Sequence, residues 1–254
     1  MVGQVLPLLL RELRTCGSTQ HWTFRVLGNI KSQLCVQEVL RGAPPTAADV
    51  DRLPRCCDVV LETLRVHPPA YMVGRCAAVD TTLPVPSAAG SSGSGGCGVA
   101  ATEGGGSSGG SAAGSEGGSE GSGGYRIPAG TTALVAPYLL HLRPHVWGDD
   151  AGSFRPARWP RLRAAGAVGA SWRSALAGLG PGGCYIPFGG GPRNCVGTGF
   201  AFLEAVLVLA MILQRVRLEP PERGAPFPPP APLITLRPEQ VRVRLRTRVP
   251  RRRR

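Results

Sequence analysis

The sequence predicts an α+β protein that is mainly α. Two stretches, residues 30–40 and 53–66, have the apolar spacing of amphipathic helices, and a third, residues 200–213, is apolar almost throughout. Two short β-type segments, TTLPV and YRIPAGTTALVAPY, flank a glycine- and serine-rich stretch as the two arms of a hairpin would. Helices and one small hairpin therefore account for the regular structure that the pattern indicates.

Composition limits the classes of protein that the chain can form. Its 254 residues suffice for one large domain or two small ones, and the 43% hydrophobic content is ordinary for a globular protein. The net charge of +13 comes almost wholly from arginine, since Lys31 is the only lysine, and it favours acidic partners. Eight cysteines are scattered with no secretory signal before them, so we expect reduced thiols in an intracellular setting rather than a disulfide framework.

The first two predicted helices are bounded by ordinary stop signals. The helix at residues 30–40 ends before Gly42 and a pair of prolines, and Thr46 is placed to cap a short turn after them. The helix at residues 53–66 ends at His67, because the two prolines that follow disfavour helical geometry in the residue before them.

A long insert separates the two hairpin arms. Residues 87–124 are nearly all glycine, serine and alanine, so they cannot bury enough apolar surface to offset the entropy of ordering, and we predict disorder. Such an insert costs the hairpin little, because loop-closure entropy rises only logarithmically with length. The chain thus divides into an unassigned N-terminal part (1–31), helices with the first hairpin strand (32–86), the insert (87–124), a C-terminal part (125–247) and a basic tail (248–254). The C-terminal part contains the second hairpin strand, an irregular stretch as far as Pro160, a glycine loop, an apolar helix and terminal strands.

The C-terminal part combines an apolar helix with an arginine-rich end. The run from Phe200 to Leu213 is shorter than the roughly 20 residues that a bilayer requires and contains Glu204, so we predict a core helix and no transmembrane segment. The end, LITLRPEQVRVRLRTRVPRRRR, alternates Val or Leu with Arg, which predicts an exposed edge strand and a basic tail. A solvated, disordered terminus is the simpler interpretation of the tail, and a specific contact is the alternative.

One cysteine stands at the mouth of a glycine loop, directly ahead of the apolar helix. In FGGGPRNCVG, three glycines and a proline lead to Cys195. Glycines let the backbone curl so that N–H groups point at the sulfur, and the positive end of the helix that begins near Gly197 favours a thiolate there. Arg193 offers a forked cation suited to a carboxylate, and Gly197 with Ala201 leaves a helix face flat enough for a large planar group. A planar ligand with an iron centre and carboxylate arms is heme, to which a cysteine ligand gives electron density that favours O–O cleavage.

These residues carry a resemblance to a known family. Six fixed positions match the pattern F-x-x-G-x-R-x-C-x-G-x-x-x-A: Phe188, Gly191, Arg193, Cys195, Gly197 and Ala201. The stretch resembles the heme-binding loop of the cytochrome P-450 superfamily, the heme-thiolate monooxygenases, and is most similar in wording to plant and algal members, including the carotenoid-hydroxylating branch. The resemblance implies that Cys195 is the axial metal ligand of heme b (iron protoporphyrin IX) and that the fold is the C-terminal half of the cytochrome P-450 fold. For the other seven cysteines, a buried thiol is the ordinary interpretation.

A second motif lies on the helix at residues 53–66. In LETLRVHPP, Glu62 and Arg65 are three residues apart and share a helix face, an arrangement that a solvated surface ion pair also explains. In the family that the loop resembles, this helix contributes to a buried Glu–Arg–Arg network behind the heme loop, and here FRPARW supplies Arg158 as the second arginine. The family's usual glutamate before that arginine is replaced by Ala157, which leaves the local packing in doubt. By resemblance these residues hold the fold and do not perform chemistry.

The hairpin and its exit follow the family's order as well. By resemblance, Arg75 in YMVGR lies near a heme propionate, with an ordinary surface arginine as the alternative, and His141 is placed near a propionate too. None of the four histidines is spaced from a cysteine as in a zinc site, so we expect no structural zinc.

The resemblance extends from about Ser32 to Thr247, which corresponds to the C-terminal half of a complete member. The family's long helix with an acid–threonine signature, which delivers protons to bound oxygen, has no counterpart in the sequence. Asp80-Thr81-Thr82 lies after the E-x-x-R helix, with no helical pattern around it, and is interpreted as strand residues. We therefore identify no catalytic residue and expect a truncated chain that lacks the oxygen-activating helix.

The resemblance implies an oxidoreductase of the monooxygenase type. It would insert one oxygen atom of O2 into an apolar small-molecule substrate, with electrons from an NADPH-dependent reductase or a ferredoxin whose acidic surface suits the arginine-rich chain. A non-catalytic heme-binding fragment or relic is the alternative. A basic nucleic-acid-binding protein is a remote third hypothesis, because no recognised module and no aromatic interleaving accompany the basic tail, so we expect no specific nucleic acid. The expected location is intracellular, and in the complete protein at the endoplasmic reticulum or a plastid membrane.

Overall fold

The computed structural model describes residues 32–83, 124–178, 180–219, 230–232, 235–238 and 244–247. These residues form helices and small two-stranded sheets, which confirms the predicted α+β, mainly α class. They divide into two compact units: the smaller is Gly74–Val135, and the larger takes the described residues up to Val73 and from Ala136 onward. The N-terminal segment 1–31, the glycine- and serine-rich insert apart from Gly124, and the basic tail lie outside the described residues.

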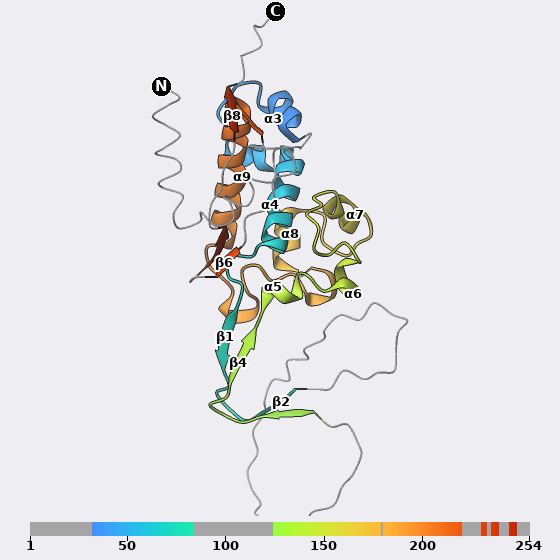
Figure 1. Cartoon of the computed structure of the whole chain (residues 1–254), viewed down its shortest axis with the longest axis vertical. Coiled ribbons are helices and arrows are strands. Elements are labelled where there is room, and N and C mark those ends of the chain that lie inside the picture. The colour runs from blue at the N-terminus through green and yellow to red at the C-terminus, as the bar shows by residue number, and fades with distance from the viewer. Residues whose placement is uncertain are drawn as a thin grey trace, which may run out of the picture. The chain divides into compact units, whose positions relative to one another are not determined.

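The described elements follow one another as helices, a strand-rich part, helices again and, after α9, four short strands (Figure 1). The helices are α3 (Ser32–Leu40), α4 (Pro54–Val66), α5 (Pro137–Leu140), α6 (Pro144–Trp147), α7 (Arg158–Ala164), α8 (Trp172–Ala177) and α9 (Thr198–Arg215), with 3₁₀ turns η2 (Ala47–Arg52), η3 (Pro181–Gly183) and η4 (Gly191–Arg193). The strands are β1 (Val73–Cys76), β2 (Thr81–Leu83), β3 (Tyr125–Ile127), β4 (Thr132–Val135), β5 (Val216–Glu219), β6 (Pro230–Pro232), β7 (Leu236–Pro238) and β8 (Arg244–Thr247).

Helix α4 is the central element of the larger unit. It begins with Pro54 in its first turn, where the missing N–H of proline costs no helical hydrogen bond, and it ends at His67 as the following prolines predict. The sequence pattern suggested one apolar face, but every residue from Cys56 to Val66 is buried, charged ones included. The helix contacts α3, α7, α8 and α9, so it has no solvent face over this stretch.

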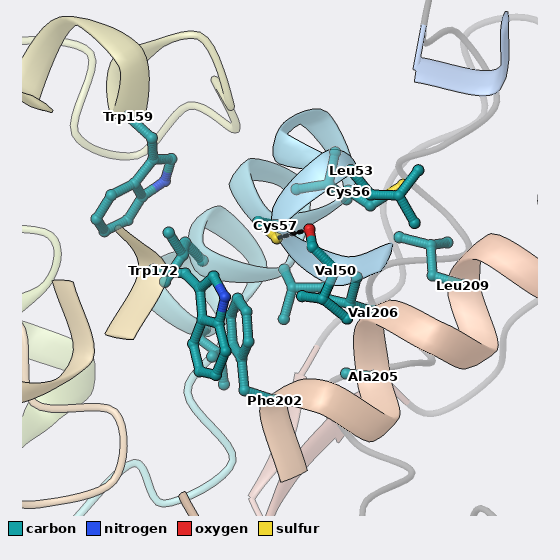
Figure 2. Packing of buried hydrophobic residues seen from close by; sticks show 14 of the residues in the cluster. Val50, Leu53, Cys56, Cys57, Trp159, Trp172, Phe202, Ala205, Val206 and Leu209 are labelled. Atoms are coloured by element: carbon teal, nitrogen blue, oxygen red, sulfur yellow. Dashed lines mark hydrogen bonds between the residues drawn. The ribbon is translucent and has the colours of Figure 1, made fainter. Parts of the chain in front are cut away.

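Helix α9 packs lengthwise against α4 and α3 (Figure 1). At its N-terminal end the Phe202 ring stacks on Trp172 of α8, with ring centroids 4.6 Å apart, and Val206 and Leu209 continue the contact toward Val50 (Figure 2). Among the described helices, α9 is also the one whose length and mean hydropathy would suffice to cross a membrane. In the structure it buries Phe202, Ala205, Val206, Val208, Leu209, Ala210, Ile212 and Leu213 against the rest of the larger unit.

The stretch from Tyr138 to Pro160 is more regular than the sequence predicts. It contains most of α5, all of α6 and the start of α7, each of which has a proline or tryptophan in or beside its first turn. Helices of one or two turns are too short to show a 3.6-residue periodicity, and their order comes from tertiary contacts instead. Trp147 and Trp159 are the contacts that matter here, since both are buried in the core.

The smaller unit is a hairpin whose arms are each broken into two strands. Strand β2 pairs antiparallel with β3, with Thr81 opposite Ile127, and β1 pairs with β4. At the bend, the Asp80 carboxylate accepts hydrogen bonds from the Arg126 guanidinium and from the Ala129 N–H, both at 2.8 Å. The sequence pattern identified the segments of β2, β3 and β4. It did not identify β1, which was placed in the hairpin through resemblance alone, because glycine, arginine and cysteine interrupt its alternation. In the larger unit, exposed β8 pairs antiparallel with β5.

Packing between α4 and α9 makes a large-to-small substitution in α9 costly. Leu209→Ala removes a side chain that is 2% exposed, and the expected loss in unfolding free energy is about 2–5 kcal/mol because the surrounding core cannot close the cavity. The matched control is Leu139→Ala, because Leu139 is 65% exposed and its truncation is expected to cost no more than about 0.5 kcal/mol. Urea unfolding of the three proteins measures both values. Equal destabilisation by the two substitutions would contradict the packing described here.

Candidate functional site: a buried ion network behind an exposed cysteine loop

The Glu62 carboxylate lies in the core, fully buried, at the middle of α4. Arg65 approaches it in a forked geometry, with Nε 3.0 Å from Oε2 and Nη2 2.9 Å from Oε1. Arg158 of α7 donates from Nε to Oε1 at 3.0 Å. The Arg155 backbone N–H and the Trp159 indole N–H complete the set, at 2.8 and 3.1 Å. These five hydrogen bonds replace those to water and so offset the free-energy cost of burying the carboxylate.

The Arg65 guanidinium donates five hydrogen bonds, as many as the Glu62 carboxylate accepts. Besides the two bonds to Glu62, Nη1 donates to the carbonyls of His141 and Ala151 at 2.8 and 2.6 Å, and Nη2 donates to the Ser153 carbonyl at 3.0 Å. All five N–H groups of this side chain are therefore used, in a plane that also lies over the Trp147 ring. The arginine ties the chain between α5 and α7 to α4.

Arg158 links this network to a second carboxylate. Its Nη2 lies 3.3 Å from Oδ1 of Asp150, and Nη1 donates to the Trp147 carbonyl at 3.1 Å. Asp150 also accepts from Arg155, and these hydrogen bonds, that of Arg155 first, hold the pKa of its carboxyl below the usual value. Glu62 and Asp150 thus balance the charges of Arg65, which is buried, and Arg158, which is half-buried. Asp150 supplies this second carboxylate, since Ala157, directly before Arg158, has none. Asp150 was not identified from the sequence.

His141 is not available to a heme propionate, contrary to the sequence-based expectation. The residue is fully buried, its Nδ1 lies 3.1 Å from the Arg65 carbonyl oxygen, and its Nε2 accepts a hydrogen bond from the Ile186 N–H at 2.9 Å. Burial lowers the pKa of His141 to about 4, although the hydrogen bond to the Arg65 carbonyl acts in the opposite direction. A neutral imidazole bonded at both nitrogens has nothing left to offer a carboxylate.

Cys195 lies at the surface, on a loop whose backbone is fixed on both sides. Its N–H donates to the Phe188 carbonyl at 3.0 Å, and its own carbonyl accepts from the Thr198 hydroxyl at 2.6 Å at the start of α9. Gly189 and Gly191 have φ of +83° and +68°, a backbone conformation that favours glycine. A Cβ built at Gly197 would lie 3.8 Å from the Cys195 Sγ, so glycine keeps that side of the sulfur clear.

The surroundings of the thiol are open and partly apolar. Val196 is fully exposed and Phe200 is 74% exposed, both beside a loop that is itself exposed from residue 190 onward. Arg193 is exposed on the same loop, while Phe188 and Ala201 are half-buried at its two ends. Exposed large apolar side chains around a polar group are typical of a binding surface. Five of the six residues that the sequence assigned to the site lie between Phe188 and Gly197, and Ala201 lies in the first turn of α9.

Arg75 lies in the other compact unit, on β1. It is exposed, and its guanidinium donates to the carbonyl of its neighbour Gly74 at 2.8 Å. A role for Arg75 toward a propionate therefore stays a prediction from resemblance. The other thiols differ from Cys195: Cys56, Cys57 and Cys184 are buried, and burial raises the pKa of Cys57 to about 12.

The donor set around Cys195 fits a metal that brings most of its own ligands. Nowhere in the described part of the chain do three or more His, Cys, Asp or Glu side chains gather as they would around a bare ion. One exposed thiol, an open glycine surface and a nearby arginine instead suit a metallated macrocycle, in which the ring supplies the equatorial ligands and the protein an axial one. The residues present therefore fit heme.

The mainly α fold and the residues of this loop fit a heme-binding type of protein, and comparison with known proteins identifies the family. The sequence model of the family "Cytochrome P450" matches residues 121–245. Cyclooctatin synthase from Streptomyces melanosporofaciens is 31% identical over 85% of this chain and 37% of its own length. Cytochrome P450 monooxygenase alt2 from Alternaria solani is 30% identical over 84% of this chain and 33% of its own length. Secologanin synthase 2 from Catharanthus roseus is 38% identical over 46% of this chain and 20% of its own length.

The chain belongs to the cytochrome P450 family and corresponds to its C-terminal half. It spans about a third of the length of the first curated relatives that it matches.

Removal of the central charge should be far more costly than removal of a surface ion pair. Glu62→Gln leaves the buried Arg65 guanidinium without a carboxylate and leaves Arg158 with Asp150 alone, and we expect a loss of about 3–5 kcal/mol in unfolding free energy. Arg126→Ala is the control, since the Arg126–Asp80 pair is solvent-exposed and its loss should cost less than about 1 kcal/mol. Chemical unfolding measures both. A Glu62→Gln protein as stable as the control would show that the network is not needed.

Two histidines, His141 (buried) and His67 (half-buried), predict a dependence of stability on pH. Burial, assisted by the Arg65 charge, lowers the pKa of His67 to about 3, and burial lowers that of His141 to about 4. In the unfolded chain both rings take up protons near pH 6.5. The unfolded state therefore binds more protons between about pH 6.5 and 4, so unfolding free energy is fully retained above that window and falls as the pH falls through it.

The measurement is the urea midpoint at pH 7.5, 6.0 and 5.0, which should decrease in that order. Asp58 acts in the opposite direction at the acidic end, since burial raises the pKa of its carboxyl despite its ion pair with Arg163. The lowered pKa values of Asp49, Asp80 and Asp150 take effect below the ordinary carboxyl pKa of 3.8, outside the measured range. A midpoint that does not change from pH 7.5 to 5.0 would contradict the lowered pKa values of the two histidines.

Proposed function

We propose that Cys195 is the axial thiolate ligand of heme b and that this chain provides the thiolate side of a monooxygenase site. The observation that carries the proposal is the exposed Cys195 thiol on a backbone-fixed glycine loop, directly ahead of a buried helix. Cys56, Cys57 and Cys184 are buried in the same compact unit, so they are poorly placed for a ligand as large as a porphyrin.

When bound, heme supplies oxygen activation, with one atom of O2 entering an organic substrate and the other leaving as water. The chain's own contributions are positional and electrostatic. Cys195 supplies the axial sulfur, Arg193 is exposed within the same loop and suits a porphyrin carboxylate, and Gly197 leaves the sulfur uncovered. Glu62 and the two arginines that it binds hold the segments behind the loop and take no part in the chemistry.

The activity of the whole protein is part of the proposal, because the chain spans about a third of its first curated relatives. We propose an apolar small-molecule substrate and an electron donor that is an NADPH-dependent reductase or a ferredoxin. The net charge of +13 supports a donor with an acidic docking face. A heme-binding fragment without turnover is the alternative.

Substitution of the proposed ligand tests the proposal. The protein is supplied with heme, reduced under carbon monoxide and examined by absorption spectroscopy, in which a thiolate ligand gives a distinct Soret position. Cys195→Ser should lose that signature, because serine offers no thiolate. Cys76→Ser is the matched control, since Cys76 is the other exposed thiol among the described residues and should leave the spectrum unchanged.

Two outcomes would decide against the proposal or its scope. A thiolate-type band that survives Cys195→Ser, or that never forms in the unsubstituted protein, would overturn the assignment of the ligand. A thiolate-type band with no oxidation of any apolar substrate, in the presence of a reductase and of the complete protein, would favour the alternative of a heme-binding protein without turnover.

A further inference from the structure

A chain of hydrogen bonds connects the buried network to the cysteine loop, and His141 lies in the middle of it. On one side of the imidazole, Nδ1 lies 3.1 Å from the carbonyl oxygen of Arg65. On the other side, Nε2 accepts from the Ile186 N–H at 2.9 Å. The His141 carbonyl in turn accepts from Arg65 Nη1 at 2.8 Å, so the histidine and the arginine bind each other twice.

The His141 ring supplies a hydrogen-bond donor to a backbone carbonyl at the C-terminal end of α4. Arg65 lies in the last turn of the helix, where backbone carbonyls have no helical N–H to accept from. Because Nε2 accepts a hydrogen bond from the Ile186 N–H, the neutral ring must carry its own proton on Nδ1, which donates to that carbonyl. Burial lowers the pKa of His141 to about 4 and so keeps the ring in this neutral form at physiological pH.

From Ile186 the connection continues through the backbone to the cysteine. The Ile186 carbonyl accepts from the Gly189 N–H at 3.0 Å, and the Phe188 carbonyl accepts from the Cys195 N–H at 3.0 Å. Residue 185 is fixed to the same helix by a separate bond, since the Tyr185 hydroxyl donates to the Leu61 carbonyl at 2.9 Å. The base of the loop is thus attached to α4 at two successive residues, directly at 185 and through His141 at 186.

We propose that His141 is a positioning residue that fixes the Cys195 loop relative to α4 for heme ligation. The inference rests on the proposed role of Cys195 and adds to it a residue that is 54 positions away in sequence. The imidazole is buried, and it bridges a helix end and a loop amide through one hydrogen bond to each.

Two substitutions separate the two sides of the bridge. His141→Gln keeps an amide oxygen near the place of Nε2, within reach of the Ile186 N–H. His141→Asn keeps an amide N–H near the place of Nδ1, within reach of the Arg65 carbonyl, and leaves the Ile186 N–H without its acceptor. Both lose one bond in the core, so a merely structural role predicts similar effects from the two. His145→Asn is the control, because His145 is exposed on α6.

The readouts are amide hydrogen exchange at Ile186 and Cys195, and the ratio of thiolate-type to other Soret absorbance in the reduced carbon monoxide complex. We expect His141→Asn to speed exchange at both amides and lower the ratio by about tenfold, which is the factor that roughly one net hydrogen bond supplies. His141→Gln should remain within about twofold of the unsubstituted protein, and His145→Asn should match it.

Equal effects of the Gln and Asn substitutions, tracking their loss of unfolding free energy, would overturn the positioning role. No effect of either would overturn it as well. If the unsubstituted protein shows no thiolate-type band, the assignment of Cys195 has failed. The exchange data then still decide whether His141 holds the loop, because they need no bound heme.

Discussion

The placement of the Glu62 carboxylate in the core is the constraint on which the rest of the larger unit depends. An ionised carboxylate without partners at this depth would cost several kcal/mol at least. Its five donors come from α4 itself, from the Arg155 backbone and from α7, so each of these segments must be in place before the charge is satisfied. Because Arg65 then uses its three remaining N–H groups on backbone carbonyls, the chain between α5 and α7 is held to α4 as well.

The same constraint reaches the exposed loop by way of the backbone of α4. The Leu61 and Arg65 carbonyls are one helical turn apart, and they receive the Tyr185 hydroxyl and the His141 ring. Burial raises the pKa of Tyr185, so its hydroxyl remains a donor at any physiological pH. A shift of α4 within the core would therefore displace residues 185 and 186 together, and with them the base of the loop that leads to Cys195.

Features that depend on local sequence were predicted well, and features that depend on tertiary contacts were not. The pairing of Glu62 with Arg65 follows from a spacing of three on a helix, whereas Arg158 was assigned only through resemblance. Asp150 and Trp159, which complete the network, gave no signal because nothing in their neighbourhood marks them as buried partners. His141 was misjudged because its place in a motif does not reveal which way an imidazole points.

The buried network and the exposed cysteine loop differ in solvent exposure and in the hydrogen bonds that hold them. Side chains of the network are buried and bonded several times over, while residues 190–196 are exposed and depend on a few backbone hydrogen bonds. Segments of the latter kind belong to the low end of local stability, where a ligand can bind without opening the core. A loop attached firmly at its base and open at its tip leaves the sulfur accessible to a large planar group while limiting its range of positions. Less ordering free energy is then needed when that group binds, which is the physical advantage of anchoring an exposed ligand to a buried charge network.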